Sequence, residues 1–325
     1  MAFYRSQSQN LKLVSLGTDP ELEMVIGSRV HRADNQPYTC RFGAIGRDGD
    51  GNWGNQVELR PKAANDPLEL VENIKNLFRI WRRQNRSAPA PKKLGVKGDR
   101  YSLGGHIHFG FNHNNPYESC GCEDLKLFAR LLDLFYGRRL ANLCGTARER
   151  DGYKLFAGDA NAVRLQKWGF EYRVPPSSFL AHPEFCKLVF TVSFKLGQKF
   201  WAGNLLTRPN LTQGVELDLA YSPREGFGRD KIALTSDFVR NEILNEEDTK
   251  KLLAFIYYYR SSRHIDPNDI ITTWLGNEPV QEEVDPRSLW PSIPSPTPGD
   301  QGEDLGREIR RALGVEDDEP SFERT

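Results

Sequence analysis

Four short segments of the chain place charged or histidine side chains two residues apart in strand-like surroundings. The segments are GTDPELE, VELR, GGHIHFG and FEYR, with the polar residues Asp19, Glu21 and Glu23, Glu58 and Arg60, His106 and His108, and Glu171 and Arg173. Side chains at positions i and i+2 of a β-strand point to the same face. The residues between them are apolar: Leu22, Leu59, Ile107 and Tyr172. The segments therefore predict a sheet with one face buried under helices and a polar face turned to water or ligand.

Helical patterns alternate with these segments. Residues 11–60 combine short apolar stretches with turn residues, which predicts β-structure, and strands are also predicted at 103–111 and 168–174. Asp66 is a candidate N-cap with Pro67 at the first helical position, and apolar residues recur at helical spacing to Trp81. Further helices are predicted at 122–143, 182–203 and 237–259. This order favours an α+β fold, a mostly antiparallel sheet with helices on one face.

The last fifty residues differ in composition from the rest. Residues 277–298 are rich in Pro, Glu and Ser with little apolar periodicity, and the chain ends in the acidic EDDEPSFERT. The segment EDLGREIRRALG can form one short amphipathic helix. We therefore predict a compact domain over residues 1–275 and, over 276–325, a Pro-rich linker with an acidic, largely flexible tail.

The overall charge argues against two classes of partner. Lys and Arg together number 44, as do Asp and Glu, and the sequence pI is about 7.0. No net field would draw such a chain onto nucleic acid or an anionic membrane. The N-terminus lacks a signal-peptide-like apolar run, and no apolar run approaches the length of a membrane span. The sequence therefore predicts a cytoplasmic protein without nucleic-acid or membrane partners, and it sets no oligomeric state.

The five cysteines, at positions 40, 120, 122, 144 and 186, are odd in number and scattered. Such a set does not form a disulfide framework and fits a reducing compartment. The Cys-Gly-Cys spacing at 120–122 differs from a zinc knuckle, and no second pair follows, which argues against a structural zinc.

Taken singly, each polar pair is an ordinary solvated strand face. Taken jointly, carboxylates converging on one sheet face repel one another unless cations lie among them. Carboxylate oxygens select Mg²⁺ or Mn²⁺, which also bind phosphate oxygens. Arg60 and Arg173, on the same strands, have the fork geometry that binds phosphate. The pattern therefore predicts a metal and phosphate site.

The four segments together resemble the COOH-NH2 ligases of the amidoligase group, of the type found in phages such as phiEco32. This superfamily is related to glutamine synthetase and glutamate-cysteine ligase. The resemblance runs from about residue 16 to about residue 179, and GGHIHFG and EYRVPPSS are its most specific parts. It implies a glutamine-synthetase-like catalytic domain that uses ATP and Mg²⁺, with Mn²⁺ as an alternative.

The resemblance also implies roles for individual residues. The implied metal ligands are Glu21, Glu23, Glu58, His106 and Glu171. The implied catalytic residues are Glu58, Arg60, His106 and Arg173, and the implied nucleotide-binding residues are Arg164, Arg173 and His108. Asp19 remains open between a ligand and a turn residue before Pro20.

The reaction that follows from the resemblance joins a carboxylate-bearing substrate to an amine-bearing one through an acyl phosphate. Peptides, including cell-wall peptides, are candidate substrates, and a phage-encoded protein would act in the host cytoplasm. Two alternatives remain. The His-x-His strand also suits a metal-dependent hydrolase, although that site would need more histidines. A non-catalytic scaffold could retain the ligase fold, although it would have no reason to keep mutually repelling carboxylates.

Overall fold

The computed structural model describes residues 11–33, 38–48, 55–85, 88–112, 122–141, 143–147, 162–202, 243–258 and 265–276. These residues belong to one compact unit, Met1–Pro279. From residue 277 onward, the predicted linker and tail lie outside the described residues, as does the segment 237–242 of the last predicted helix.

A four-stranded antiparallel sheet carries two of the four polar segments. Its strands are β1 (Leu13–Thr18), β8 (Ile107–Phe111), β10 (Gly169–Tyr172) and β9 (Val163–Gln166), in the order β1-β8-β10-β9. The predicted strand at 103–111 begins only at Ile107, because Gly104 and Gly105 bridge to the Pro175-Pro176 segment. Strand β9 precedes β10 in a hairpin that the sequence analysis did not predict.

The other strands form a second sheet, where a single sheet was predicted. They are β2 (Glu21–Ile26), β3 (Arg29–His31), β4 (Tyr38–Cys40), β5 (Gly43–Arg47), β6 (Val57–Pro61) and β7 (Lys92–Gly95). The order is β3-β2-β6-β5-β4, with β7 paired to β2, and every pair is antiparallel. The chain passes from β1 directly into β2 through Asp19 and Pro20, so this crossing joins the two sheets.

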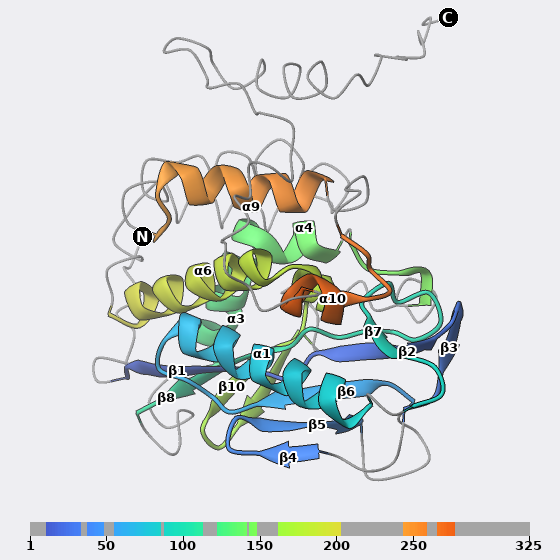
Figure 1. Cartoon of the computed structure of the whole chain (residues 1–325). Helices are drawn as coiled ribbons and strands as arrows, with labels where there is room; N and C mark the ends of the chain where they lie inside the picture. The colour runs from blue at the N-terminus through green and yellow to red at the C-terminus, as the bar shows by residue number, and fades with distance from the viewer. Residues whose placement is uncertain are drawn as a thin grey trace, which may run out of the picture. The chain divides into compact units, whose positions relative to one another are not determined.

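Helices cover one side of the strands, as predicted (Figure 1). The helices are α1 (Pro67–Gln84), α3 (Cys122–Leu132), α4 (Arg138–Ala141), α6 (Pro183–Trp201), α9 (Glu246–Tyr258) and α10 (Ile270–Leu275). Asp66 caps α1, accepting from the Leu68 N–H, with Pro67 in the first turn as predicted. The predicted helix at 122–143 is interrupted by a π-helical turn, Asp133–Gly137, and a 3-10 turn, Ser177–Ala181, precedes α6. No helix in the described ranges is long and apolar enough to cross a membrane.

The two faces of the four-stranded sheet have opposite chemistry. Phe109 and Phe170 are fully buried and pack on Phe128 of α3. On the same face, the Tyr172 hydroxyl donates a hydrogen bond to the buried Asp133 in the π-helical turn. Because side chains alternate along a strand, His108 and Glu171 point to the opposite face. The alternation predicted from the sequence therefore places the polar residues away from the helices.

Candidate active site

One row of functional side chains crosses the four-stranded sheet in register. His108 of β8 pairs with Glu171 of β10, and Glu171 pairs with Arg164 of β9. On the other side, His108 pairs with Gly17 of β1. Directly paired residues of an antiparallel ladder stand on the same face. The imidazole, carboxylate and guanidinium therefore lie side by side.

A second, shorter row lies on the other sheet. Glu21 of β2 pairs with Glu58 of β6, so two carboxylates face each other across neighbouring strands. Like charges in that position repel. Glu58 forms an ion pair with Arg60, whose guanidinium also donates to the Arg47 carbonyl oxygen over 3.4 Å.

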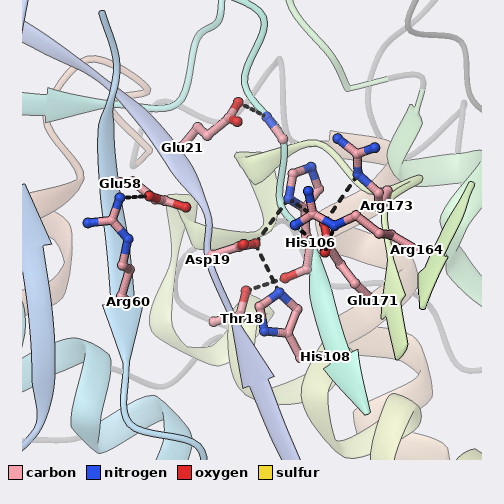
Figure 2. Close-up of polar contacts among 11 residues, drawn as sticks. Thr18, Asp19, Glu21, Glu58, Arg60, His106, His108, Arg164, Glu171 and Arg173 are labelled. Carbon is pink, nitrogen blue, oxygen red and sulfur yellow. Dashed lines mark hydrogen bonds and ion pairs between the residues drawn. The ribbon is translucent and has the colours of Figure 1, made fainter. Parts of the chain in front are cut away.

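Asp19 connects the two rows from the crossing between β1 and β2 (Figure 2). The Nδ1 atom of His106 lies 3.0 Å from Asp19 Oδ1, and the Nε2 atom of His108 lies 3.2 Å from the same oxygen. The Thr18 hydroxyl donates to the His106 carbonyl oxygen over 2.6 Å and fixes the crossing against the entrance to β8. The His-x-His spacing therefore turns both rings toward one carboxylate.

Glu171 is the most buried member of the site. Its Oε2 atom accepts from Arg164 Nε over 2.6 Å, and its Oε1 atom lies 3.2 Å from both Arg173 Nε and His106 Nδ1. The Glu171 side chain has no solvent exposure, whereas the Arg164 side chain is 51% exposed. One buried carboxylate thus orients two guanidinium groups, and Arg164 retains donors that can reach a ligand.

Charge is balanced differently at Asp19 and Glu58. Burial alone would raise the pKa of Asp19, but the neighbouring imidazoles of His106 and His108 outweigh burial and hold this pKa well below its ordinary value. Burial raises the pKa of Glu58 to about 8 despite the opposing charge of Arg60, and neighbouring carboxylates add to this rise. Glu58 therefore lies in an acidic environment that a cation would relieve.

Three residues have the donor set of a divalent metal site. Asp19, His108 and Glu171 each offer one ligand atom, and these atoms lie within 4.8 Å of one another. His108 Nε2 and Glu171 Oε1 are buried and make no hydrogen bond within the described residues, although ion-pair neighbours lie at 3.2 Å. Two carboxylates and an imidazole fit Mg²⁺ or Mn²⁺, which take oxygen ligands with an occasional histidine.

The two glutamates of the acidic strand GTDPELE accept hydrogen bonds from different parts of the backbone. Glu21 Oε2 accepts from the Gly104 N–H over 2.7 Å, at the edge of the site. Glu23 Oε1 accepts from the Arg100 and Tyr101 N–H groups over 2.9 and 3.0 Å, and the side chain is buried. Glu23 thus anchors a loop, and the structure places this predicted ligand apart from the three-residue donor set.

Asp19 belongs to the three-residue donor set, although the sequence analysis left its role open between a ligand and a turn residue. Its signal was present in the sequence, because Asp19 and Glu21 obey the same i, i+2 rule as the other pairs. The neighbouring Pro20 gave an equally good local explanation as a turn. The contacts to His106 and His108, which lie far along the chain, favour the role as a ligand.

A pocket of about 480 Å³ opens beside the cluster. Asp19, His108, Glu58 and Arg60 line its charged end, and Trp168 belongs to its apolar lining. Most of the predicted residues therefore come together here: the carboxylates of two sheets, both histidines of GGHIHFG, and three arginines (Figure 2).

Carboxylates, histidines and arginines brought together in this way are typical of enzymes that transfer phosphoryl groups with a metal ion. The family model described as phage phiEco32-like COOH·NH2 ligase, type 2, matches residues 16–196. The match spans more than half of the chain, which therefore belongs to this family of ATP-dependent, amide-forming ligases. No curated protein matches the chain. Family membership confirms the resemblance and favours a ligase over the hydrolase and scaffold alternatives.

Proposed function

We propose that the chain activates a substrate carboxylate with ATP as an acyl phosphate and joins it to an amine in the pocket beside Asp19. The observation that carries this proposal is the convergence of Asp19, His108 and Glu171 on one point, with arginines on either side. Family membership supplies the reaction class, and this cluster supports its location.

The chemistry needs no side-chain nucleophile. A carboxylate oxygen of the substrate attacks the γ-phosphorus of ATP, and ADP leaves. The amine nitrogen then attacks the carbonyl carbon of the acyl phosphate, inorganic phosphate leaves, and one proton is lost from nitrogen. The protein contributes orientation and charge stabilisation.

The arginines are suited to the phosphate oxygens. Arg164 and Arg173 are held by Glu171, so their guanidinium groups are oriented before a ligand arrives. Arg60 of β6 lines the pocket beside Asp19 and is 41% exposed. A guanidinium fork binds phosphate oxygens in bidentate fashion. These three side chains would hold the nucleotide and stabilise negative charge during phosphoryl transfer.

Asp19, His108 and Glu171 would hold a Mg²⁺ or Mn²⁺ ion, with His106 keeping the two carboxylates in place. Such an ion would neutralise charge on the phosphate oxygens. Glu21 and Glu58 would supply the negative charge for a second cation. The predicted roles of Glu58, Arg60, His106 and Arg173 in catalysis are compatible with this arrangement, and Glu23 would act through the loop that it anchors.

The carboxylate and amine substrates remain proposals at the level of class. A peptide or cell-wall peptide would supply one or both groups, and a phage-encoded protein would act in the host cytoplasm. The hydroxylamine trap for acyl phosphates tests this class directly, because hydroxylamine replaces the amine and only the carboxylate has to be found.

Calorimetry with Mg²⁺ and a non-hydrolysable ATP analogue is the first test. We expect binding that requires Mg²⁺ and is weakened at least 100-fold in Glu171→Ala, because that change removes a ligand and releases two arginines. Glu72→Ala is the matched control, since Glu72 lies in an exposed ion pair with Arg79. A folded wild-type protein that binds no nucleotide with Mg²⁺ present would rule out the proposed site.

A further inference from the structure

A strip of small residues lies one row beyond the charged row of the four-stranded sheet. Ser15 of β1 pairs with Gly110 of β8, and Gly110 pairs with Gly169 of β10. These residues lie two positions from Gly17, His108 and Glu171 and therefore share their face, about 6 to 7 Å further along the strands. A Cβ atom at Gly110 would collide with the Ser15 hydroxyl. The row therefore forms a shallow floor beside the charged site.

Trp168 stands over one end of this floor. It occupies the two-residue turn between β9 and β10, and its ring centroid lies 5.2 Å from that of His108 with the planes 40° apart. The side chain is 41% exposed and is one of three large apolar side chains exposed within the described ranges. Trp168 lines the pocket and its ring contacts the ring of His108. A ligand bound in the pocket would therefore bury the exposed face of the indole ring.

The residues that line the pocket near Trp168 are apolar or small. Trp168, Phe111, Ala63 and Gly110 line the same 480 Å³ pocket as Asp19 and Arg60. A ligand that fills the pocket therefore needs a strongly anionic part at one end and a flat, largely apolar part at the other. ATP has this construction, because its triphosphate carries the charge and its purine base offers aromatic faces.

We propose that Trp168 and the Ser15–Gly110 floor form the platform for the purine base of ATP. This inference rests on the proposed nucleotide site. The base stacks on the Trp168 indole ring, and the triphosphate extends past His108 toward Asp19 and the arginines. Stacking on an aromatic side chain uses the π-face that every base has, so Trp168 contributes affinity without reading the hydrogen-bonding edge of the base.

The competing occupant is an apolar part of the carboxylate or amine substrate. The position of Trp168 argues against it, because the indole ring lies directly beside His108, a member of the metal donor set. The nucleotide is the substrate whose phosphates belong at that set. The two occupants are separated by a ligand that carries the phosphates and lacks the base.

The test compares a non-hydrolysable ATP analogue with inorganic tripolyphosphate, both titrated calorimetrically with Mg²⁺ present. For Trp168→Ala we expect affinity for the analogue to fall about 10- to 100-fold, the range of base stacking on an aromatic ring. Tripolyphosphate affinity should change less than about twofold. Trp168→Phe should recover most of the loss, because it restores an aromatic face.

Two further variants control for the possibility that Trp168→Ala loses affinity because it misfolds. Ala63 is exposed and lines the pocket, so Ala63→Leu narrows the pocket without disturbing buried packing. This variant should weaken the analogue more than it weakens tripolyphosphate. Leu68→Ala removes an exposed apolar side chain of α1 that does not line the pocket, and it should bind both ligands as the wild type does.

Three outcomes would overturn the platform. Wild-type affinity for the analogue in Trp168→Ala would place the base elsewhere and leave the proposed function standing. Equal weakening of the analogue and tripolyphosphate would make Trp168 a support for His108. A wild-type protein that binds neither ligand would remove the proposed nucleotide site and the platform with it.

Discussion

The half of the candidate active site built from β8 and β10 carries its countercharges within the protein, whereas the half built from β2 and β6 brings carboxyl groups together with less compensation. In the first half, Glu171 lies against Arg164, Arg173 and His106. In the second, Glu21 and Glu58 face each other across the strands, and the pKa of Glu58 is raised to about 8. The first half is therefore organised before any ligand binds, while the second would be relieved by a cation.

The largest difference should appear when Glu171 is neutralised. Glu171→Gln removes the charge that compensates two arginines, and breaking such a buried arrangement by removing one partner costs about 3 kcal/mol after allowance for the exposure of Arg164. We expect the free energy of unfolding of the metal-free protein, measured by urea denaturation at pH 7, to fall by that amount.

Glu72→Gln on α1 serves as the reference for this measurement. Glu72 and Arg79 form an ion pair with both side chains about half exposed, and such surface pairs contribute less than about 1 kcal/mol. Equal losses in Glu171→Gln and Glu72→Gln would show that the β8–β10 half does not depend on its internal ion pairs.

Much of this arrangement was accessible from local sequence patterns. The cap and periodicity of 66–81 predicted α1, and the i, i+2 pairs predicted which face of each strand is polar. Both signals depend on residues close in sequence. Residues 182–203 likewise gave α6, with His182 as its N-cap.

Apart from the local β9–β10 hairpin, the main features that escaped prediction depend on distant partners. The division into two sheets is set at Pro20, whose carbonyl oxygen accepts from the Leu59 N–H. Glu21 and Glu23 share a face, yet the Arg100 and Tyr101 N–H groups bind Glu23 alone. The π-helical turn at Asp133–Gly137 interrupts a helix where Gly137 meets the Tyr172 hydroxyl. Patterns of residues close in sequence do not predict these three features, because each depends on contacts with residues far along the chain.

His182, which lies outside the β8–β10 half, should make the stability of the protein depend on pH. His182 accepts the Glu184 N–H at the start of α6 and packs on Phe255 of α9. Burial lowers its pKa from 6.5 to about 4. Below pH 6.5 the unfolded chain takes up a proton that the folded protein refuses, so stability falls as pH decreases. Between pH 6.5 and pH 5 the loss attributable to His182 should be about 2 kcal/mol.

His182→Asn isolates this contribution. Asparagine can cap the helix and does not titrate, so the variant loses some ring packing at pH 7 but should show a shallower decline between pH 6.5 and pH 5. Urea denaturation at several pH values gives both slopes. If the free energy of unfolding declines equally with pH in the wild type and the variant, the loss of stability in acid does not come from His182.

The smallest effect should have the opposite sign and fall on the acidic half. In the absence of metal, Glu58→Gln removes a buried carboxylate that faces Glu21 and Asp19, and it breaks an ion pair in which Arg60 is 41% exposed. The unfolded chain ionises this carboxyl freely at pH 7, whereas burial raises its pKa in the folded protein to about 8, so Glu58 lowers the stability of the fold at that pH. Removing this cost should outweigh the loss of the Arg60 contact, and we expect the metal-free protein to gain about 1 kcal/mol at pH 7. Thermal denaturation with a chelator present would measure this gain.

Excess Mg²⁺ should reverse the order of the two proteins. If Glu58 helps to hold a cation, the wild type gains stability as the ion binds, and Glu58→Gln gains less. A variant that is destabilised without metal, as Glu171→Gln is expected to be, would mean that Arg60 already neutralises this half. The comparison between the halves would then fail at its acidic side, and the second cation would no longer be needed to explain why Glu21 and Glu58 face each other.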